Sequence, residues 1–202
     1  MADPSIYPHE LASRTIRLLA VEPGDRETPL RCQLAETYLD TTSISYYALS
    51  YCWGPNHSLI EITCNSRPLF VTPNLHAFLL EYRHRGTNIP LWVDAICIDQ
   101  SNNSERTSQV RMMDQIYSRA DCVVVWLGEA KATDRLAVDV LRLIHVVWAS
   151  TPKVSHLDHS RDVLAHDAWL SSNVPQVSWN ALAAFLLRPW FSRMWMYVTH
   201  RP

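Results

Sequence analysis

Two acids and an amide gather around one apolar stretch of the sequence, LWVDAICIDQ at residues 91–100. Asp94 is the charged residue inside the stretch, and Asp99 and Gln100 end it. We predict that 91–98 is a buried strand, so that these side chains lie near its carboxyl end, where open α/β sheets place their ligand crevices. All three are candidate ligand-binding residues. The alternative is structural, because a buried carboxylate that is paired or hydrogen-bonded can hold a loop or cap a helix without binding a ligand.

An aromatic group ends a second apolar run, YYALSYCWG at residues 46–54. It supplies four further candidates for ligand contact: Ser50, Tyr51, Trp53 and Gly54. If this run is a central strand of the same sheet, its end lies at the same edge as Asp94, and aromatic faces beside a glycine turn suit the stacking of a nucleotide base or another ring. The alternative is that Trp53 packs in the core and Gly54 only provides a turn conformation.

Glu105 and Arg106 open the segment after LWVDAICIDQ, where Ser104 is a plausible helix cap. The start of a helix can present backbone N–H groups to a phosphate, which makes both residues candidate ligand contacts. An acid in the first helical turn is also favoured by the helix dipole alone. Because no glycine-rich loop precedes this helix, the usual phosphate cradle is absent.

Metal chemistry and the common hydrolase and kinase chemistries find little support. In the polar segment 156–167, three histidines and two of the three aspartates form a cluster, but their spacing fits no standard zinc pattern, and we expect a solvated loop and no metal site. The sequence contains no GxSxG, HExxH or Walker motif. The histidines and aspartates of the cluster at 156–167 are His156, Asp158, His159, His166 and Asp167.

The first half of the chain is predicted to be rich in strands. Segments 15–21 and 30–36 are separated by the turn-forming EPGDRETP and predict a hairpin, and IEITC and PLFVT around residues 65–67 predict a second one. Thr72 then looks like an N-cap with Pro73 at the first helical position, and the helix should end near Gly86. The apolar positions Leu75, Phe78, Leu79 and Tyr82 share one face of this helix.

Helices and strands then alternate. Residues 104–120 predict one amphipathic helix with an apolar face of Val110, Met113, Tyr117 and Ala120, and 121–128 predict a second buried strand. Strand, helix and strand form a βαβ unit with parallel pairing. Helices are expected at about 133–149 and 178–187, the second broken by Arg188-Pro189, with a loop or insertion at 150–176 between them. The expected fold class is α/β, a three-layer, mostly parallel sheet with an N-terminal β-hairpin extension, preceded by a tail at 1–13.

Composition favours a protein of the cytoplasm. The chain has 202 residues, 48% of them hydrophobic, which suffices for one large core. The net charge is −2, and no basic run is present, so we expect neither nucleic acid nor an anionic membrane as a partner. No segment has the apolar length of a signal peptide or a membrane span. The five cysteines lack CxxC spacing and mostly lie in apolar runs, which indicates reduced, buried thiols.

Four blocks resemble those of the heterokaryon incompatibility (HET) domain of fungi, and the resemblance covers roughly residues 15–197. In order they are YALSYCWG, VTPNLHAFL, the long block LWVDAICIDQ with ERTSQVRMMDQIYSRADCVVVWLG, and RPWFSRMW. The resemblance implies a domain of nonself recognition and programmed cell death, with protein partners or self-association. It also implies a remote similarity to TIR domains, which have a flavodoxin-like sheet and in some branches cleave NAD. The motif residues expected to be structural are Arg188, Pro189, Trp190, Phe191, Arg193 and Trp195.

The last block departs from the family pattern. HET domains usually continue it to Gln-Glu, and that Glu is the counterpart of the TIR catalytic glutamate, but this sequence has Val198 and Thr199 there. A hydroxyl cannot replace a carboxylate that stabilises an oxocarbenium charge. We therefore expect a disarmed or C-terminally truncated HET domain over 14–202. Two alternatives stay open: an enzyme with NAD as substrate and no resident cofactor, and a non-catalytic module that self-assembles or recruits a partner.

Overall fold

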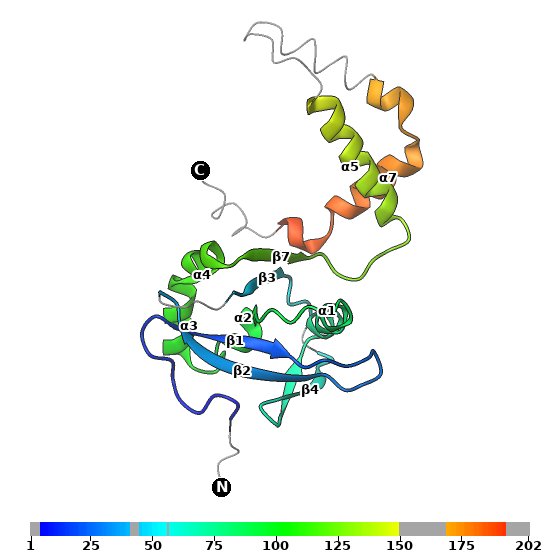
Figure 1. Cartoon of the computed structure of the whole chain (residues 1–202). Helices are drawn as coiled ribbons and strands as arrows, with labels where there is room; N and C mark the ends of the chain where they lie inside the picture. Colours follow the sequence, from blue (N-terminus) through cyan, green and yellow to red (C-terminus); the bar gives the residue numbers. More distant parts are fainter. Residues whose placement is uncertain (1–4, 41–44, 56, 150–168, 193–202) are drawn as a thin grey trace, which may run out of the picture. The chain divides into compact units, whose positions relative to one another are not determined.

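A computed structural model describes residues 5–40, 45–55, 57–149 and 169–192 (Figure 1). The chain divides into two compact units, Met1–Glu129 and Ala130–His200, and each has its own core. The first unit contains β1 (Thr15–Val21), β2 (Arg31–Tyr38), β3 (Tyr47–Tyr51), β4 (Ile60–Cys64), β5 (Arg67–Val71), α1 (Pro73–His84), β6 (Leu91–Trp92), α2 (Asp94–Cys97), α3 (Asn103–Arg111), α4 (Met113–Arg119) and β7 (Cys122–Trp126). The second contains α5 (Asp134–Ala149), α7 (Gln176–Leu186) and the short 3-10 helix η1 (Pro189–Ser192).

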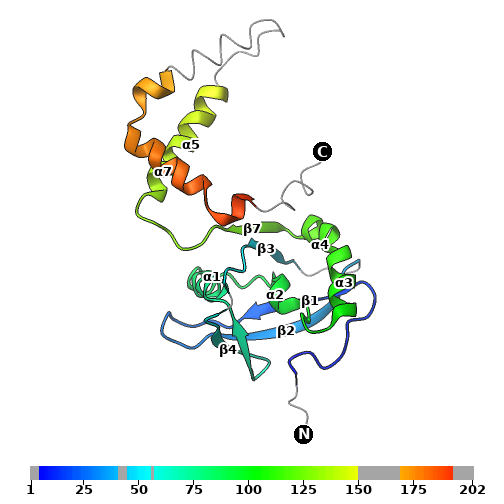
Figure 2. The same cartoon turned by 180° about the vertical axis from the view of Figure 1, so that it is seen from behind.

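The first unit is built on a seven-stranded sheet of order β5-β4-β2-β1-β6-β3-β7. The predicted N-terminal hairpin is confirmed, and β1 and β2 pair antiparallel along their length (Figure 2). It is not an extension, however, because β1 also pairs with β6 and β2 also pairs with β4, which places the hairpin in the middle of the sheet. Four consecutive β1 residues, from Ile16 to Leu19, are buried, and since neighbouring side chains point to opposite faces, both faces of β1 are covered.

The sheet is mixed, whereas a mostly parallel one was expected. Three of its neighbouring pairs are parallel (β2–β4, β3–β6 and β3–β7) and three are antiparallel (β1–β2, β1–β6 and β4–β5). The predicted parallel crossover is confirmed, with the modification that β6 and β7 lie on either side of β3 and each pairs with it. Two of the antiparallel pairs, β1–β2 and β4–β5, are hairpins, and the short turn between β4 and β5 holds Asn65 and Ser66 at positive φ.

The predicted strand at 91–98 is wrong beyond its first residues. Only Leu91 and Trp92 are in β6, and Asp94–Cys97 form the short helix α2. Ile96, Cys97 and Ile98 are nevertheless buried, so the run is apolar because it is enclosed and not because it is extended. A continuous apolar run does not distinguish a buried strand from a buried helix, which explains the error.

The single helix predicted at 104–120 is two helices, α3 and α4, which meet at Met112. Its buried face also differs from the prediction, because Glu105 and Gln109 are buried while Val110 is 55% exposed. Gln109 donates from Nε2 to the backbone oxygen of Thr15, which ties α3 to β1 within the core. The apolar periodicity failed because the inward positions of α3 make polar contacts to the hairpin.

Helix α1 follows its prediction closely. Thr72 is the N-cap and accepts a hydrogen bond from the N–H of Leu75, and Pro73 occupies the first turn. The four predicted apolar residues are buried, and Gly86 follows the helix at a φ of 66°. The ring of Phe78 lies 5.6 Å from that of Trp126, which packs α1 against β7.

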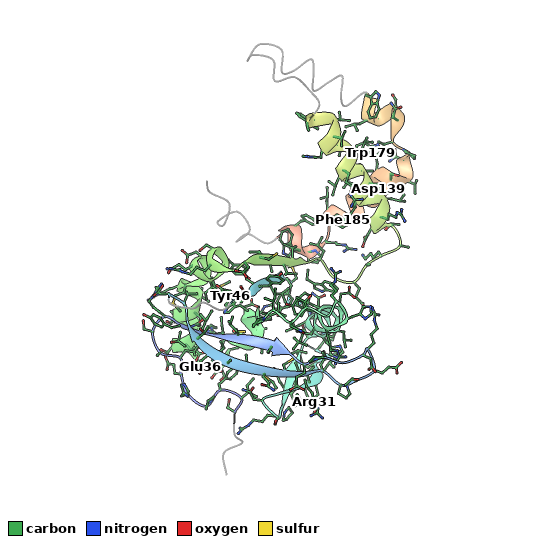
Figure 3. The ribbon with its side chains drawn as sticks, viewed as in Figure 1. Arg31, Glu36, Tyr46, Asp139, Trp179 and Phe185 are labelled. Atoms are coloured by element: carbon green, nitrogen blue, oxygen red, sulfur yellow. The ribbon has the colours of Figure 1, made fainter. Side chains whose placement is uncertain are left out.

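The strand β7 is less buried than predicted. It is an edge strand paired with β3, and Val123 and Val125 are each 42% exposed. Tyr46, labelled in Figure 3, directly precedes β3. Its hydroxyl donates to the backbone oxygen of Ile116 at 2.6 Å and so ties α4 to the sheet. Of the cysteines, Cys32, Cys64 and Cys97 are buried as expected, but Cys122 is exposed and Cys52 is intermediate.

The second unit is a helical pair with its own apolar cluster. Ala137 and Val140 of α5 pack with Ala181 and Leu182 of α7, and the partly buried Trp179 and Phe185, both labelled in Figure 3, pack against this cluster. Residues 169–173, at the end of the segment expected to be a loop, are helical, and 150–168 lie outside the described residues. Among the described residues, no helix is both long enough and apolar enough to cross a membrane.

Candidate functional site

The carboxyl ends of β3 and β7 lie side by side because the two strands are parallel neighbours in register, Tyr51 opposite Trp126. The chain turns away from each end at a glycine in the left-handed region, Gly54 at a φ of 74° and Gly128 at 96°. A side chain from the first turn of α1 joins these ends. Asn74 donates from Nδ2 to the backbone oxygen of Cys52 at 2.6 Å and accepts at Oδ1 from the indole of Trp126 at 2.9 Å.

Trp53 is fixed at this edge by an acid from the start of α2. Its indole Nε1 donates to Oδ2 of Asp94 at 3.0 Å, while Oδ1 of Asp94 accepts from the backbone N–H of Ala95 at 2.8 Å. Gln100 donates to the backbone oxygen of Asp94 and so ties the loop after α2 to its start. Trp53 is 40% exposed, so one region of its ring faces solvent although its polar end is held.

Trp53 and Asn74 line a cleft of about 260 Å³ that lies wholly within the first unit. The walls combine one exposed indole, two prolines, a methyl group, the Asn74 amide and one carboxylate, that of Glu129. A concave apolar surface with few polar groups, at the carboxyl edge of parallel strands, is the usual position of a ligand site in an α/β protein. The lining residues are Trp53, Pro55, Pro73, Asn74, Ala77 and Glu129.

Comparison with known proteins then identifies the family. The family model described as "Heterokaryon incompatibility protein (HET)" matches residues 46–198, which is most of the chain and includes every residue of the cleft. This chain belongs to the HET family. The match begins after the β1–β2 hairpin, although that hairpin forms the middle of the sheet.

A curated relative supports the assignment to the HET family. The chain is 36% identical over 185 residues to heterokaryon incompatibility protein 6, OR allele, of Neurospora crassa. The alignment covers 85% of this chain and 25% of that protein, so the chain spans about a quarter of the length of this relative. No solved structure matches the chain.

Of the nine candidate ligand contacts predicted from the sequence, Trp53 lines the cleft of this HET domain, while Gly54 and Asp94 support it. Ser50 and Tyr51 are only 2% and 1% exposed and belong to the core of β3. Gln100 acts through its bond to the Asp94 backbone. The end of the run 46–54 therefore meets the segment 91–98 at one contact, the hydrogen bond between Trp53 and Asp94.

Asp99, Glu105 and Arg106 make local or buried structural contacts. Oδ1 of Asp99 accepts from the N–H and hydroxyl of Ser101, which closes a turn. Arg106 donates to Oδ1 of Asn103, one helical turn before it. The predicted cap Ser104 is replaced by Asn102, whose side chain accepts from the amides of Ser104 and Glu105.

Glu105 is the centre of a buried ion pair that joins three parts of the HET domain. Its Oε1 accepts from Nη1 of Arg17 at 2.6 Å and from the N–H of Asp99 at 2.7 Å, and its Oε2 accepts from Nη2 of Arg17 and the N–H of Leu11, both at 3.1 Å. Burial alone would raise the pKa of Glu105, but the hydrogen bonds from Arg17, Asp99 and Leu11 outweigh it and lower that pKa.

The described family-motif residues, Arg188 to Phe191, lie in the second unit. Arg188 donates to both carboxylate oxygens of Asp134 at 2.7 Å and lies 5.1 Å from the ring centre of Phe185, so it joins the start of α5 to the end of α7. Pro189, Trp190 and Phe191 form η1, with the two aromatic rings 5.3 Å apart. Arg193, Trp195 and Thr199 lie outside the described residues, as does the histidine-rich segment 156–167.

Of the six lining residues, sequence reasoning predicted only Trp53 as a ligand contact, and it missed the two other polar ones, Asn74 and Glu129. Asn74 lay within the block VTPNLHAFL but looked like an ordinary first-turn helix residue. Glu129 follows the Gly128 that ends the predicted strand, a position where a polar residue after a turn carries no special signal. An exposed acid directly after the carboxyl end of a strand is nevertheless the same kind of signal that singled out Asp99, and it would have identified Glu129.

Proposed function

We propose that this chain is a HET module of fungal nonself recognition that acts in the cytoplasm and promotes programmed cell death. The observation that carries the proposal is the family match over residues 46–198, because these residues include β3, α1, α2 and β7, which together build the cleft. The relative in Neurospora crassa carries incompatibility in its name. Protein partners or self-association are part of this proposal.

A flavodoxin- or TIR-like three-layer core belongs to the same proposal. The support is that β1 and β3 are buried along consecutive residues, which requires cover on both faces, and that β6 and β7 are both parallel to β3. The central antiparallel hairpin departs from a simple doubly wound sheet. The centre of this sheet therefore differs from that of a TIR-like sheet, while the carboxyl ends of β3 and β7 still lie together at one edge.

A second candidate function is cleavage of NAD, and the observation that favours it is Glu129 in the cleft beside Trp53. In this reaction the bond between the nicotinamide nitrogen and ribose C1′ breaks, and water adds to C1′ to give nicotinamide, ADP-ribose and a proton. A carboxylate near C1′ stabilises the oxocarbenium-like transition state. Glu129 is the only carboxylate among the described cleft residues, so it takes the role that Thr199 cannot fill.

The third candidate is a non-catalytic module that assembles with itself or with a partner. The supporting observation is the edge strand β7, whose sequence CVVVW has no charge or proline and whose Val123 and Val125 are exposed. Edge strands without charges or prolines are suited to pairing with another chain. This candidate needs no carboxylate in the cleft.

The test is induced expression of the chain in fungal cells, with NAD content and viability measured at equal amounts of intact protein. Three variants accompany it: Glu129→Gln, the pair Val198→Gln with Thr199→Glu, and Val125→Lys on the edge strand. Cell death with NAD loss that Glu129→Gln abolishes supports the enzyme. NAD loss that appears only in the pair supports a disarmed enzyme.

Two further outcomes decide the remaining alternatives. Cell death at constant NAD that Val125→Lys abolishes supports assembly through β7. If none of the forms affects viability although each is present and folded, the cell-death proposal for this chain is refuted.

A further inference from the structure

The chemistry of the cleft is set by the groups that remain uncommitted. The Asn74 amide is used at both ends, by the Cys52 carbonyl and the Trp126 indole, and the N–H of Trp53 is used by Asp94. What is left to meet a ligand is the exposed part of the Trp53 ring, apolar surface from Pro55, Pro73 and Ala77, and the Glu129 carboxylate. Among the described residues Glu129 forms no ion pair.

These groups select against a phosphate or another anionic group inside the cleft, although it adjoins the start of α1, so that only the cationic nicotinamide end of NAD could enter it. Pro73 has no N–H, and Thr72 already accepts the N–H of Leu75, so two of the first-turn donors that would hold a phosphate are absent or occupied. Among the residues that the structure describes, no lysine, arginine or histidine lines the cleft. An anion entering it would meet the Glu129 carboxylate without a compensating cation.

We propose that this cleft binds a small organic cation whose charge is carried on an apolar head, such as a trimethylammonium group. The negative face of an indole attracts a cation within about 6 Å, and this attraction is strongest for groups that are weakly hydrated. Methyl groups on the cation suit the proline and alanine walls, while Glu129 supplies the opposing charge. This goes beyond the cell-death function, and it depends on neither NAD cleavage nor assembly.

The cleft is prepared for such a ligand because its parts are held in place before binding. Asp94 fixes the Trp53 ring through its polar end, and Asn74 ties α1 to the ends of both β3 and β7. A pre-organised site loses little conformational entropy on binding, which allows a small contact area to give measurable affinity. Asp94 is thus a positioning residue that acts through Trp53.

The first experiment compares choline with its neutral carbon isostere, 3,3-dimethyl-1-butanol, by titration of the purified full chain followed by NMR. We expect choline to bind with a Kd on the order of 1 mM and the isostere to bind at least about fivefold more weakly. The variant Glu129→Gln should weaken choline binding at least about threefold and leave the isostere unchanged. Glu61→Gln, a change at an exposed carboxylate on β4, is the matched control and should bind as the parent does.

A second pair of variants tests the role of Asp94. Asp94→Asn keeps an oxygen that can accept from the Trp53 indole, whereas Asp94→Ala removes it. We expect Asp94→Ala to weaken choline binding several-fold and Asp94→Asn to restore most of it, with the NMR spectrum of each confirming the fold. The proposal is overturned if choline fails to bind, if the isostere binds equally well, or if neither Glu129→Gln nor Asp94→Ala changes choline affinity.

Discussion

The buried pair between Arg17 and Glu105 makes the sharpest prediction about stability. The side chains of Arg17 and Glu105 are 2% and 1% exposed, and each carboxylate oxygen of Glu105 accepts two hydrogen bonds. The change Glu105→Gln keeps the shape but replaces one oxygen by an NH₂ group, which would face two donors, and it leaves the Arg17 charge uncompensated. Removing one partner of a buried ion pair costs about 3–5 kcal/mol.

The expected loss lies at the lower end of that range because a second acid is near. Oε1 of Glu36 lies 3.6 Å from Nε of Arg17, and the Glu36 side chain is 34% exposed, so it compensates the charge only in part. We therefore expect Glu105→Gln to lower the free energy of unfolding of the first unit by about 3 kcal/mol. Adding Arg17→Met to Glu105→Gln removes the unpaired charge, and the double-mutant cycle should show a coupling of about 2 kcal/mol between the two positions.

The assay is hydrogen exchange of the β1 amides, read by mass spectrometry, because the chain has two compact units and hydrogen exchange reads the first unit by itself, whereas a single melting curve would average both. Glu61→Gln at an exposed position should change the opening free energy of β1 by less than about 0.5 kcal/mol. A loss below about 1 kcal/mol for Glu105→Gln would refute the argument, since it would mean that Arg17 finds other compensation. So would the absence of coupling in the double variant.

Further predictions follow from single contacts. Because the pKa of Glu105 is lowered in the folded protein, its contribution to stability is present above the unfolded pKa of about 4.3 and is lost as the pH falls through the folded value, so the parent should lose more opening free energy between pH 6 and pH 3 than Glu105→Gln does. Tyr46→Phe should cost about 1–2 kcal/mol, measured by hydrogen exchange of the β3 amides, because the buried carbonyl of Ile116 loses its donor. Gly128→Ala should cost about 1–2 kcal/mol in the same assay, since the backbone there has a φ of 96°. The control is Ala77→Ser, which changes a cleft residue at a helical position with ordinary backbone angles. In the native protein, Cys122 should react with a thiol reagent well before Cys32, Cys64 and Cys97, because burial raises the pKa of these three thiols to about 12, 11 and 12, and peptide mapping would contradict this if a buried thiol were labelled first.

Local sequence signals predicted the elements that carry their own punctuation. The hairpin of β1 and β2, the hairpin of β4 and β5, and α1 with its cap at Thr72 and its end near Gly86 all lie where turn residues and periodicity place them. The predicted helix before Arg188-Pro189 is also present as α7. These elements are defined by short-range chemistry, which a single sequence contains in full.

What the sequence could not provide was the partner of each buried group. The run at 91–98 is apolar because it is enclosed, and enclosure alone does not tell a strand from the helix α2. Similarly, Glu105 looked like a first-turn acid favoured by the helix dipole, but its partner Arg17 is 88 residues away in a strand that is otherwise mostly apolar. The site at Trp53 was predicted at the right edge of the sheet, while its frame residue Asn74 depends on two contacts that no local pattern encodes.

The β1–β2 hairpin lies outside the family match but helps to hold this HET domain together. Residues before 46 supply the two central strands of the sheet, and Arg17 of β1 makes the buried pair with Glu105, which lies inside the match. A fragment that begins at residue 46 would leave Glu105 buried without its cation and would expose the edges of β6 and β4 that β1 and β2 now cover. The β6 end of that opened sheet leads directly into α2, whose first residue, Asp94, positions Trp53 in the cleft. The hairpin therefore stabilises the candidate site from a distance, through the strand that carries Asp94 to it.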